Sequence, residues 1–232
     1  MKHQFIPTIK DIFTLLILAN ILFGCHKNDT KTWDDKGDSK EQNLDAQRLV
    51  HEGETREYVL YVPESYDGIA AVPLMFNFHG YGGNASEYMN YADMRSLAES
   101  ENFILVYPQG STLDGSPHWN PSLASPENKS NADDLGFIEA LINKLATDYM
   151  IDRKRIYACG YSNGGMMSYG LASHKSNLIA AVGSISGAMI DTDIVPSHPI
   201  PVIKIHGTSD EVLPYNGISG EYNSVETTLE YW

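Results

Sequence analysis

Short apolar runs and one alternating segment divide residues 55 to 232 into predicted strands. The apolar runs are bounded by glycine, proline or polar residues, which is typical of buried strands, and the alternating segment is typical of a half-buried strand. The apolar runs cover residues 73–79, 103–107, 155–159, 178–185 and 201–206, and the alternating segment covers residues 56–63. The chain therefore contains enough predicted strands to form one substantial sheet.

Helical spacing occurs between these strands. Residues 85–101 predict one helix with Tyr88, Tyr91, Met94 and Leu97 on a shared face. A second helix is expected to follow Asp133 as its cap and to end near residue 150, and its buried side comprises Leu135, Ile138, Ile142 and Leu145. Further helices are predicted after Gly165 and from Ser224 to Trp232.

The alternation of apolar strands with helices predicts the fold class. Strands buried on both sides belong to a mostly parallel sheet that carries helices on both faces, so we expect an α/β fold. In such sheets, binding sites lie at the carboxyl ends of the strands, where residues 80–83, 162 and 210 fall.

The first 50 residues do not follow this pattern. A nearly all-apolar run from residue 12 to residue 24 is too short to cross a bilayer but suits the core of a signal peptide. It ends in Leu22-Phe-Gly-Cys25, which resembles a bacterial lipobox, so we expect residues 1–24 to be a signal peptide and Cys25 to be lipidated. An ordinary signal peptide or a buried N-terminal helix are the alternatives. Residues 25–50 are mostly polar and predict a flexible tether, which leaves 51–232 as the folded domain.

Composition and charge indicate one globular domain and argue against nucleic acid as a partner. The chain has 232 residues, 42% of them hydrophobic, which suits one globular domain. Its formal net charge of −14 argues against a nucleic-acid surface, because phosphate binding requires clustered Lys and Arg. The expected export signal places the protein outside the cytoplasm, either anchored to the bacterial cell envelope or secreted. With Cys25 lipidated, the other cysteine, Cys159, is expected to be a buried strand residue.

The segment Gly160-Tyr161-Ser162-Asn163-Gly164 has the spacing of a nucleophile elbow. It joins a predicted strand to a predicted helix, and its glycines allow neighbouring backbones to pass closely. Ser162 is therefore the candidate nucleophile of an acyl-transfer reaction. The backbone N–H of Asn163, at the start of the helix, is a candidate oxyanion donor.

A second oxyanion donor is expected from the glycine-rich loop after residue 79. We favour the N–H of Tyr81, with that of Gly82 as the alternative. The spacing Gly80-x-Gly82-x-x-Ala85 also fits a dinucleotide-binding fingerprint. That interpretation requires an acidic residue at the end of the next strand, which instead ends in Tyr107-Pro108, so we reject it.

Asp210 lies four residues beyond the end of the last predicted strand. A carboxylate on this loop could hold a catalytic imidazole in the required tautomer. An aspartate in a turn also commonly caps local backbone N–H groups, which is the alternative. Its position in chain order after Ser162 favours the catalytic role.

These residues fall among motifs that resemble one family. The motifs are His79-Gly80, Tyr107-Pro-Gln-Gly110, Trp119-Asn120, Asp133-Asp-x-Gly-Phe-Ile138, Gly160-x-Ser-Asn-Gly-Gly165 and His206-Gly-x-x-Asp210. From about residue 56 to residue 232, the chain resembles the secreted α/β-hydrolase esterases that include feruloyl esterases, acetylxylan esterases and polyhydroxybutyrate depolymerase-like proteins. The resemblance implies a Ser–His–Asp triad and no metal or organic cofactor.

The resemblance also implies roles for residues around the elbow. Trp119 is expected near the substrate cleft, whereas Asp133 and Asp134 are expected to cap their helix. Independently of the resemblance, His79 and His118 are candidate substrate-binding residues because they fall on the active face. A lipid-anchored esterase of this kind would act on an ester-bearing polysaccharide or a polyester.

The chain departs from the family pattern in its histidines. Relatives carry the triad histidine after a further strand, and no histidine follows His206. We therefore expect a chain that lacks the final strand and helix. Of the other histidines, His51 is expected in or near the tether, whereas His79, His118 and His206 are expected on the active face. His79 and His206 end buried strands, which favours a structural role for both. His118, placed on a mobile loop, is the candidate surrogate base.

Three functions are therefore open. The favoured one is a serine carboxylic-ester hydrolase, impaired by the loss of its histidine. A prolyl-oligopeptidase-like serine peptidase shares the elbow and the chain order of the triad. A surface lipoprotein that keeps the fold only to bind carbohydrate is the non-enzymatic alternative.

Overall fold

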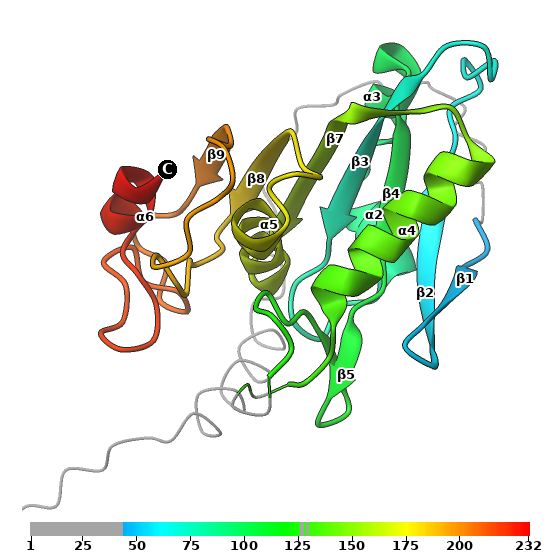
Figure 1. The fold of residues 1–232 in the computed structure, drawn as a ribbon. Helices are drawn as coiled ribbons and strands as arrows, with labels where there is room; N and C mark the ends of the chain where they lie inside the picture. The colour runs from blue at the N-terminus through cyan, green and yellow to red at the C-terminus, as the bar shows by residue number, and fades with distance from the viewer. Residues whose placement is uncertain (1–43, 126–127, 129) are drawn as a thin grey trace, which may run out of the picture. The chain divides into compact units, whose positions relative to one another are not determined.

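The computed structural model describes residues 44–125, 128 and 130–232. Their strands form a seven-stranded sheet in the order β1-β2-β4-β3-β7-β8-β9, with a separate β5–β6 hairpin (Figure 1). The seven strands are β1 Gln47–His51, β2 Glu54–Tyr61, β3 Val72–Phe78, β4 Ile104–Pro108, β7 Ile151–Tyr161, β8 Ala181–Ile185 and β9 Val202–Ile205, and the hairpin comprises β5 Ser111–Leu113 and β6 Ser116–His118. Strands β4, β3, β7, β8 and β9 are parallel, whereas β1 and β2 are antiparallel to their neighbours.

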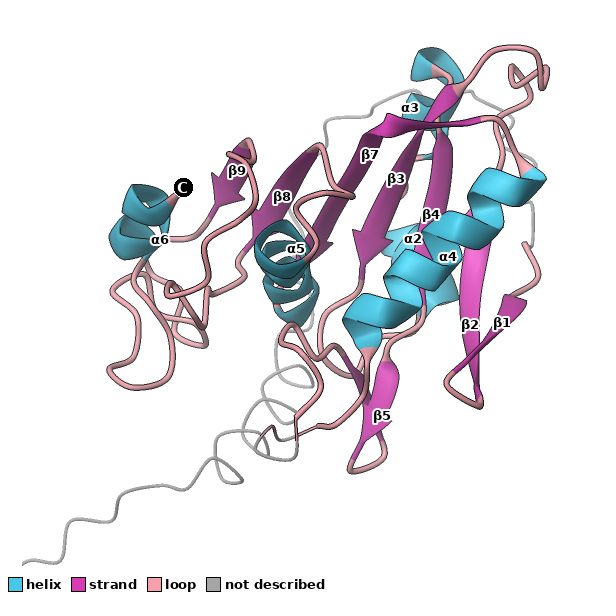
Figure 2. Cartoon of the chain, viewed as in Figure 1, coloured by secondary structure: helices cyan, strands magenta, loops and turns pink. Residues whose placement is uncertain are grey.

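Helices cover both faces of the sheet. They are α2 Ala85–Tyr91, α3 Arg95–Glu101, α4 Asp134–Asp148, α5 Asn163–His174 and α6 Val225–Tyr231. Helices α4 and α5 cross one face (Figure 2) and pack on the main core, which includes Leu74, Phe76 and Ile156 from the strands. Helices α2 and α3 pack on the opposite face against Val59 and Leu105. The predicted fold class is therefore confirmed.

Helix α4 forms as its sequence pattern predicts. The Asp133 side chain accepts a hydrogen bond from the N–H of Gly136, so it satisfies one of the unpaired donors at the helix start. The four apolar residues predicted for its inner side, Leu135, Ile138, Ile142 and Leu145, are fully buried. Spacing and capping were sufficient here because the two signals agree.

The prediction of a single helix over residues 85–101 is wrong. The structure has two helices separated at Ala92–Met94, and the Tyr107 hydroxyl stabilises the break by donating to the Ala92 carbonyl and accepting from the Met94 N–H. The break also changes the buried face. Tyr91, which was predicted to be inward, is 81% exposed, and the buried residues are Ala85, Met89 and Ala98.

The folded domain also begins earlier than the sequence pattern indicates. Residues 47–50, assigned to the tether, form most of β1, which pairs with β2 along its whole length. His51 ends this strand, and its ring nitrogen Nε2 lies 3.1 Å from Asp133 Oδ2. The expected signal peptide, Cys25 and most of the expected tether lie outside the described residues. Within the described residues, no helix combines the length and the apolarity needed to cross a bilayer.

Candidate active site

Ser162 occupies a sharp turn between β7 and α5. Its backbone has φ 54° and ψ −121°, a combination that residues other than glycine rarely adopt. The turn is fixed by two hydrogen bonds, from the Ser162 N–H to the Ile185 carbonyl at 2.8 Å and from the Met166 N–H to the Ser162 carbonyl at 3.0 Å. The strand–turn–helix geometry of a nucleophile elbow is therefore present at the predicted serine.

The two glycines that flank the serine are required by close backbone contacts. A Cβ atom on Gly164 would lie 2.2 Å from the Phe78 carbonyl oxygen, and one on Gly160 would lie 2.4 Å from the carbonyl carbon of Gly164. Neither neighbour is a flexible side chain, so no rotamer change could relieve these contacts. The glycines thus allow α5 to start directly against the end of β3.

The glycine-rich loop follows β3 and lies beside the elbow. A Cβ atom placed on Gly80 would lie 3.5 Å from the Cβ of Ser162. The loop backbone and the serine are therefore neighbours. Of the two predicted oxyanion donors in the loop, the Gly82 N–H donates to the Pro117 carbonyl at 2.7 Å. Because this N–H already has an acceptor, the Gly82 alternative is disfavoured.

His79 supports the loop from inside. Its ring is 1% exposed, its Nδ1 lies 2.7 Å from the Gly80 carbonyl oxygen, and its Nε2 accepts from the Gly110 N–H at 3.0 Å. This pattern is that of a neutral imidazole with its proton on Nδ1. Burial lowers the pKa of His79 and therefore also favours the neutral ring.

Gln109 is a positioning residue that our sequence reasoning missed. Its Oε1 accepts from the Ala85 N–H at 2.8 Å, and its Nε2 donates to the Gly83 carbonyl at 3.2 Å and lies 3.1 Å from His79 Nε2. One side chain thus joins the end of β4 to the glycine-rich loop and to the start of α2. The only signal in the sequence was its place in the motif Tyr107–Gly110.

Trp119 connects the elbow to the glycine-rich loop. The Asn163 side chain accepts from the Trp119 N–H at 2.7 Å and donates to the Trp119 carbonyl at 3.0 Å. The Trp119 indole N–H donates to the His79 carbonyl at 3.0 Å, and its ring packs edge-on against Phe78. These contacts hold the start of α5 and the end of β3 in a fixed relation.

The predicted substrate-binding residues His79, His118 and Trp119 are buried. Their exposed fractions are 1%, 4% and 1%. A ring nitrogen of each lies within hydrogen-bond distance of a main-chain carbonyl oxygen. His118 lies in β6, not on a mobile loop, and its Nδ1 is 3.1 Å from the Ser111 carbonyl. In the structure these three side chains support the elements around Ser162, and their contact with substrate stays a prediction.

Asp210 and His206 lie together beyond β9. Asp210 Oδ1 accepts from the N–H groups of Val212 and Leu213, each at 2.9 Å, which is the capping role considered as the alternative. Its Oδ2 lies 3.5 Å from His206 Nε2, which is also 2.7 Å from the Leu213 carbonyl. Among the described residues, no histidine ring hydrogen-bonds the Ser162 hydroxyl.

Asp133 and Asp134 have separate roles. Asp133 caps α4, as expected, whereas Asp134 is fully buried and forms an ion pair with Arg56 at 2.6 Å. Asp134 also accepts from the Asn120 N–H at 2.7 Å. It therefore ties β2 to the segment that follows Trp119.

A parallel sheet with a strained serine between a central strand and a helix defines the class of α/β hydrolases. Residues 70–230 match the family described as phospholipase/carboxylesterase. The chain therefore belongs to this family.

Curated relatives agree with this assignment, and solved structures agree with the fold. The chain is 35% identical over 167 residues to probable feruloyl esterase C of Aspergillus clavatus, covering 70% of this chain and 57% of that protein. It is 30% identical over 169 residues to a bifunctional acetylxylan esterase/xylanase of Neocallimastix patriciarum, covering 73% and 23%. Among solved structures, a thermostable esterase superposes with a TM-score of 0.60 at 23% identity, covering 75% of this chain and 49% of that one. An acetyl xylan esterase from Aspergillus awamori gives a TM-score of 0.51 at 23% identity, covering 62% and 53%. The chain spans about half the length of these relatives, or less.

Proposed function

We propose that the protein is a serine carboxylic-ester hydrolase that acts on acyl groups linked to a polymer. The observation that carries this proposal is the backbone of Ser162, which is held in a strained turn at the carboxyl end of β7. Strain of this kind persists only where the surrounding structure imposes it. In a nucleophile elbow, the strained turn presents the serine hydroxyl at the carboxyl end of the sheet. Feruloyl and acetyl esters, or a polyhydroxyalkanoate, are the substrates that we propose.

Ser162 Oγ would attack the ester carbonyl and form a tetrahedral intermediate. The Asn163 N–H belongs to the first turn of α5, where backbone donors have no partner within the helix. Together with the Tyr81 N–H it would stabilise the oxyanion, and each such donor contributes about 2.7–4 kcal/mol to lowering the barrier. Collapse of the intermediate would release the alcohol and leave an acylated serine.

Of the two remaining members of the triad, we assign the aspartate but not the histidine. Asp210 is proposed to orient the base, since its Oδ2 makes only the long 3.5 Å contact with His206 among the described residues. No described histidine is assigned the base. The rings of His79, His118 and His206 are engaged with main-chain groups, and none of them hydrogen-bonds Ser162.

Acylation of Ser162 can be measured directly as a covalent adduct, without complete hydrolysis of the substrate. Incubation with p-nitrophenyl acetate followed by peptide mass spectrometry should show an acetyl group on the Ser162 peptide, and fluorophosphonate should label the same residue. Ser162→Ala should abolish both adducts, whereas His118→Ala should leave them because His118 is internal. Labelling that survives Ser162→Ala would refute the proposal, and loss of labelling in a folded His118→Ala variant would make His118 the base. Preferential cleavage of a p-nitroanilide would instead indicate a peptidase.

We also propose that the protein is exported and anchored to the cell envelope through Cys25. The support is the order of lysines, apolar run and Leu-Phe-Gly-Cys at residues 2–25. Metabolic labelling with an alkyne fatty acid in a bacterial host should mark the protein, and Cys25→Ser should remove the label. Incorporation that persists in Cys25→Ser would refute the anchor.

A further inference from the structure

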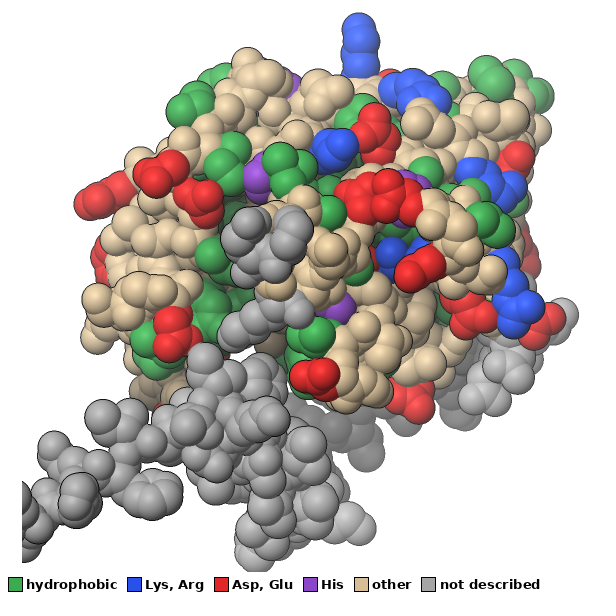
Figure 3. Space-filling view, turned by 60° about the horizontal axis from the view of Figure 1, so that its bottom comes forward, with side chains coloured by type: hydrophobic (Ala, Val, Ile, Leu, Met, Phe, Trp, Pro, Cys, Tyr) green, Lys and Arg blue, Asp and Glu red, His purple; other side chains and the backbone are tan. Residues whose placement is uncertain are grey.

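A hollow of about 620 Å³ lies beside β2, at the same end of the sheet as Ser162. The strand directions fix this placement. Because β2 runs antiparallel to β4, the start of β2 lies beside the carboxyl end of β4. Figure 3 shows this end of the molecule, where acidic and basic side chains gather around a hollow. The volume is within the range of about 300–1,000 Å³ that is typical of small-molecule sites.

The walls of this hollow, named here the β2 groove, are polar and well supported. They come from the β1–β2 hairpin, the residues after β4, β5 and residues 130–133. Arg56 forms one wall, and its guanidinium is fixed by Asp134, by the Gln109 carbonyl and by the Phe137 ring, 4.1 Å away. This wall is rigid because the Arg56 guanidinium is held in place by these three neighbours.

Three side chains of the groove offer hydrogen bonds that the described residues do not use. Glu54, Thr112 and Asn131 are exposed and line the hollow, and none has a side-chain hydrogen bond to another described residue. Glu54 is an acceptor, Thr112 is a donor and an acceptor, and Asn131 offers both an N–H₂ group and a carbonyl oxygen. A mixture of donors and acceptors matches ligand hydroxyl groups, which also both donate and accept.

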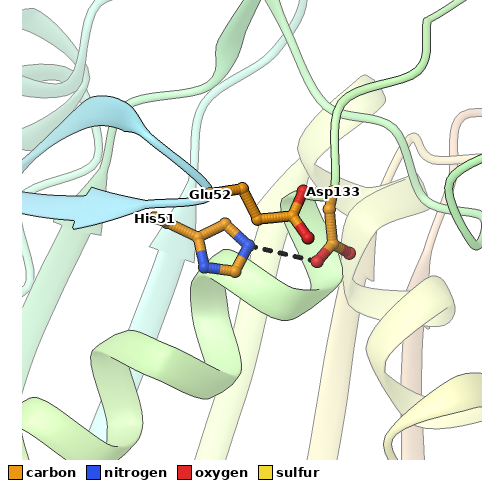
Figure 4. A group of neighbouring side chains, drawn as sticks. All are labelled: His51, Glu52 and Asp133. Atoms are coloured by element: carbon orange, nitrogen blue, oxygen red, sulfur yellow. Dashed lines mark hydrogen bonds and ion pairs between the residues drawn. The ribbon is translucent and has the colours of Figure 1, made fainter.

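Charge argues against an ionic ligand. An anion would meet the carboxylates of Glu52 and Glu54 at the rim. For a metal cation, the best cluster is His51, Glu52 and Asp133, whose ligand atoms lie within 4.8 Å of one another (Figure 4). In that cluster, however, His51 bonds Asp133 Oδ2, while Asp133 Oδ1 caps α4, where the helix dipole disfavours a cation. The groove therefore fits a neutral ligand best.

The groove is structurally continuous with the candidate active site. In the β5–β6 hairpin, Thr112 lines the groove, and its cross-strand partner Pro117 accepts the hydrogen bond from Gly82 in the glycine-rich loop. The strand order places β2 three positions from β7, which corresponds to about 14 Å at the usual strand spacing. An extended polymer could span this distance while its ester group contacts Ser162.

We propose that the β2 groove binds a neutral, hydroxyl-rich oligosaccharide segment of the polymer whose acyl group is presented to Ser162. The inference rests on the proposed function for the identity of the polymer. Binding itself requires no chemistry at Ser162, so the two proposals can fail separately.

Binding can be measured with xylohexaose by isothermal titration calorimetry on the Ser162→Ala chain, which removes any hydrolysis. The double variant Thr112→Ala/Asn131→Ala, made in the same background, should weaken binding about tenfold or more, since two hydrogen bonds to the ligand are lost. Both side chains are exposed, so the fold should be retained. The matched control is Glu101→Gln, an exposed change in α3, which precedes β4 and lies at the opposite end of the sheet.

The outcomes separate the two proposals. Xylohexaose binding that is lost in the double variant and kept in the control supports the groove, even if no ester is hydrolysed. Absence of xylohexaose binding, or equal binding by the double variant, overturns the groove while leaving acylation of Ser162 untouched. Binding of Zn²⁺ or Ca²⁺ that excludes xylohexaose and is lost in Asp133→Asn would also overturn it, in favour of a cation site.

Discussion

At the scale of single residues, buried polar side chains organise the candidate site from within. His79 and Gln109 each join segments that follow different strands; the His79 side chain is buried and that of Gln109 is half-buried. The His79 ring meets the glycine-rich loop through Nδ1, which lies 2.7 Å from the Gly80 carbonyl oxygen. Its Nε2 accepts from the Gly110 N–H after β4, which requires that nitrogen to be unprotonated. The protonation state of one buried imidazole is therefore coupled to the shape of the loop.

Acidification should destabilise the fold through His79. Burial lowers the pKa of His79 below its ordinary value of 6.5. Its contribution to stability is therefore complete above pH 6.5 and is lost as the pH falls from that value toward the lower pKa of the folded state, because the unfolded chain takes up the proton first. Urea unfolding measured between pH 7.5 and pH 5 should show part of this slope disappear in His79→Gln.

The control for this experiment is His198→Gln, the same substitution at an exposed histidine. The ring signals of His79 should also titrate below 6.5 in an NMR pH series. A His79 signal that titrates above 6.5 would contradict the neutral, buried ring.

At the scale of elements, the sequence predicted the strands and the fold class but not every boundary. Only residues 155–159 of β7 were predicted, because the strand begins at Ile151 and residues 152–155 are polar. The strands at β3, β4 and β9 were readable because they are short apolar runs with clear ends. The break between α2 and α3 was not, since it depends on the Tyr107 hydroxyl, which comes from a neighbouring strand. Strand β1 was also hidden, because its side chains are mostly exposed and it is held by pairing with β2.

The candidate site shows the same division. Ser162 and its glycines were readable because the elbow is a local motif with its own backbone requirement. The burial of His118 and Trp119 was not readable, because it arises where the β5–β6 hairpin, β3 and α5 meet. Residue type alone suggested ligand contacts for side chains that tertiary packing directs inward.

The contact between α5 and β3 should not tolerate a methyl group. In Gly164→Ala the new Cβ would lie 2.2 Å from the Phe78 carbonyl oxygen, so the start of α5 must move away from the sheet. We expect a loss of unfolding free energy of several kcal/mol, comparable to the larger core defects of about 3–5 kcal/mol, together with loss of fluorophosphonate labelling at Ser162. Chemical denaturation and labelling of the same samples would test both effects.

Gly53→Ala is the matched control for this change. Gly53 has φ +83° but nothing within 4 Å of its Cβ position, so only backbone strain opposes the substitution. Its expected cost is about 1–2 kcal/mol, with labelling of Ser162 retained. Equal effects of the two substitutions would show that the close contact at Gly164 is not what fixes the elbow.

At the scale of the whole domain, two chain segments that are distant in sequence meet at Trp119. Trp119 packs on Phe78 of β3, donates to the His79 carbonyl and is held through its backbone by Asn163 of α5. Asn120, the next residue, donates its N–H to Asp134, which in turn pairs with Arg56 of β2. The Trp119 segment therefore links the elbow, the glycine-rich loop and the β2 groove.

Substitutions at Trp119 should separate the hydrogen bond from the packing. Trp119→Phe keeps an aromatic ring beside Phe78 but leaves the His79 carbonyl without its indole donor, so the unfolding free energy should fall by about 1–3 kcal/mol. Trp119→Ala also opens a cavity in the core and should cost about 3–5 kcal/mol. Tyr91→Ala, at a side chain that is 81% exposed, should stay within about 0.5 kcal/mol of the original chain. If Trp119→Phe were as stable as the original chain while xylohexaose binding and Ser162 labelling were both weakened, Trp119 would have to contact ligand. That result would contradict the internal, positioning role that its burial assigns to it.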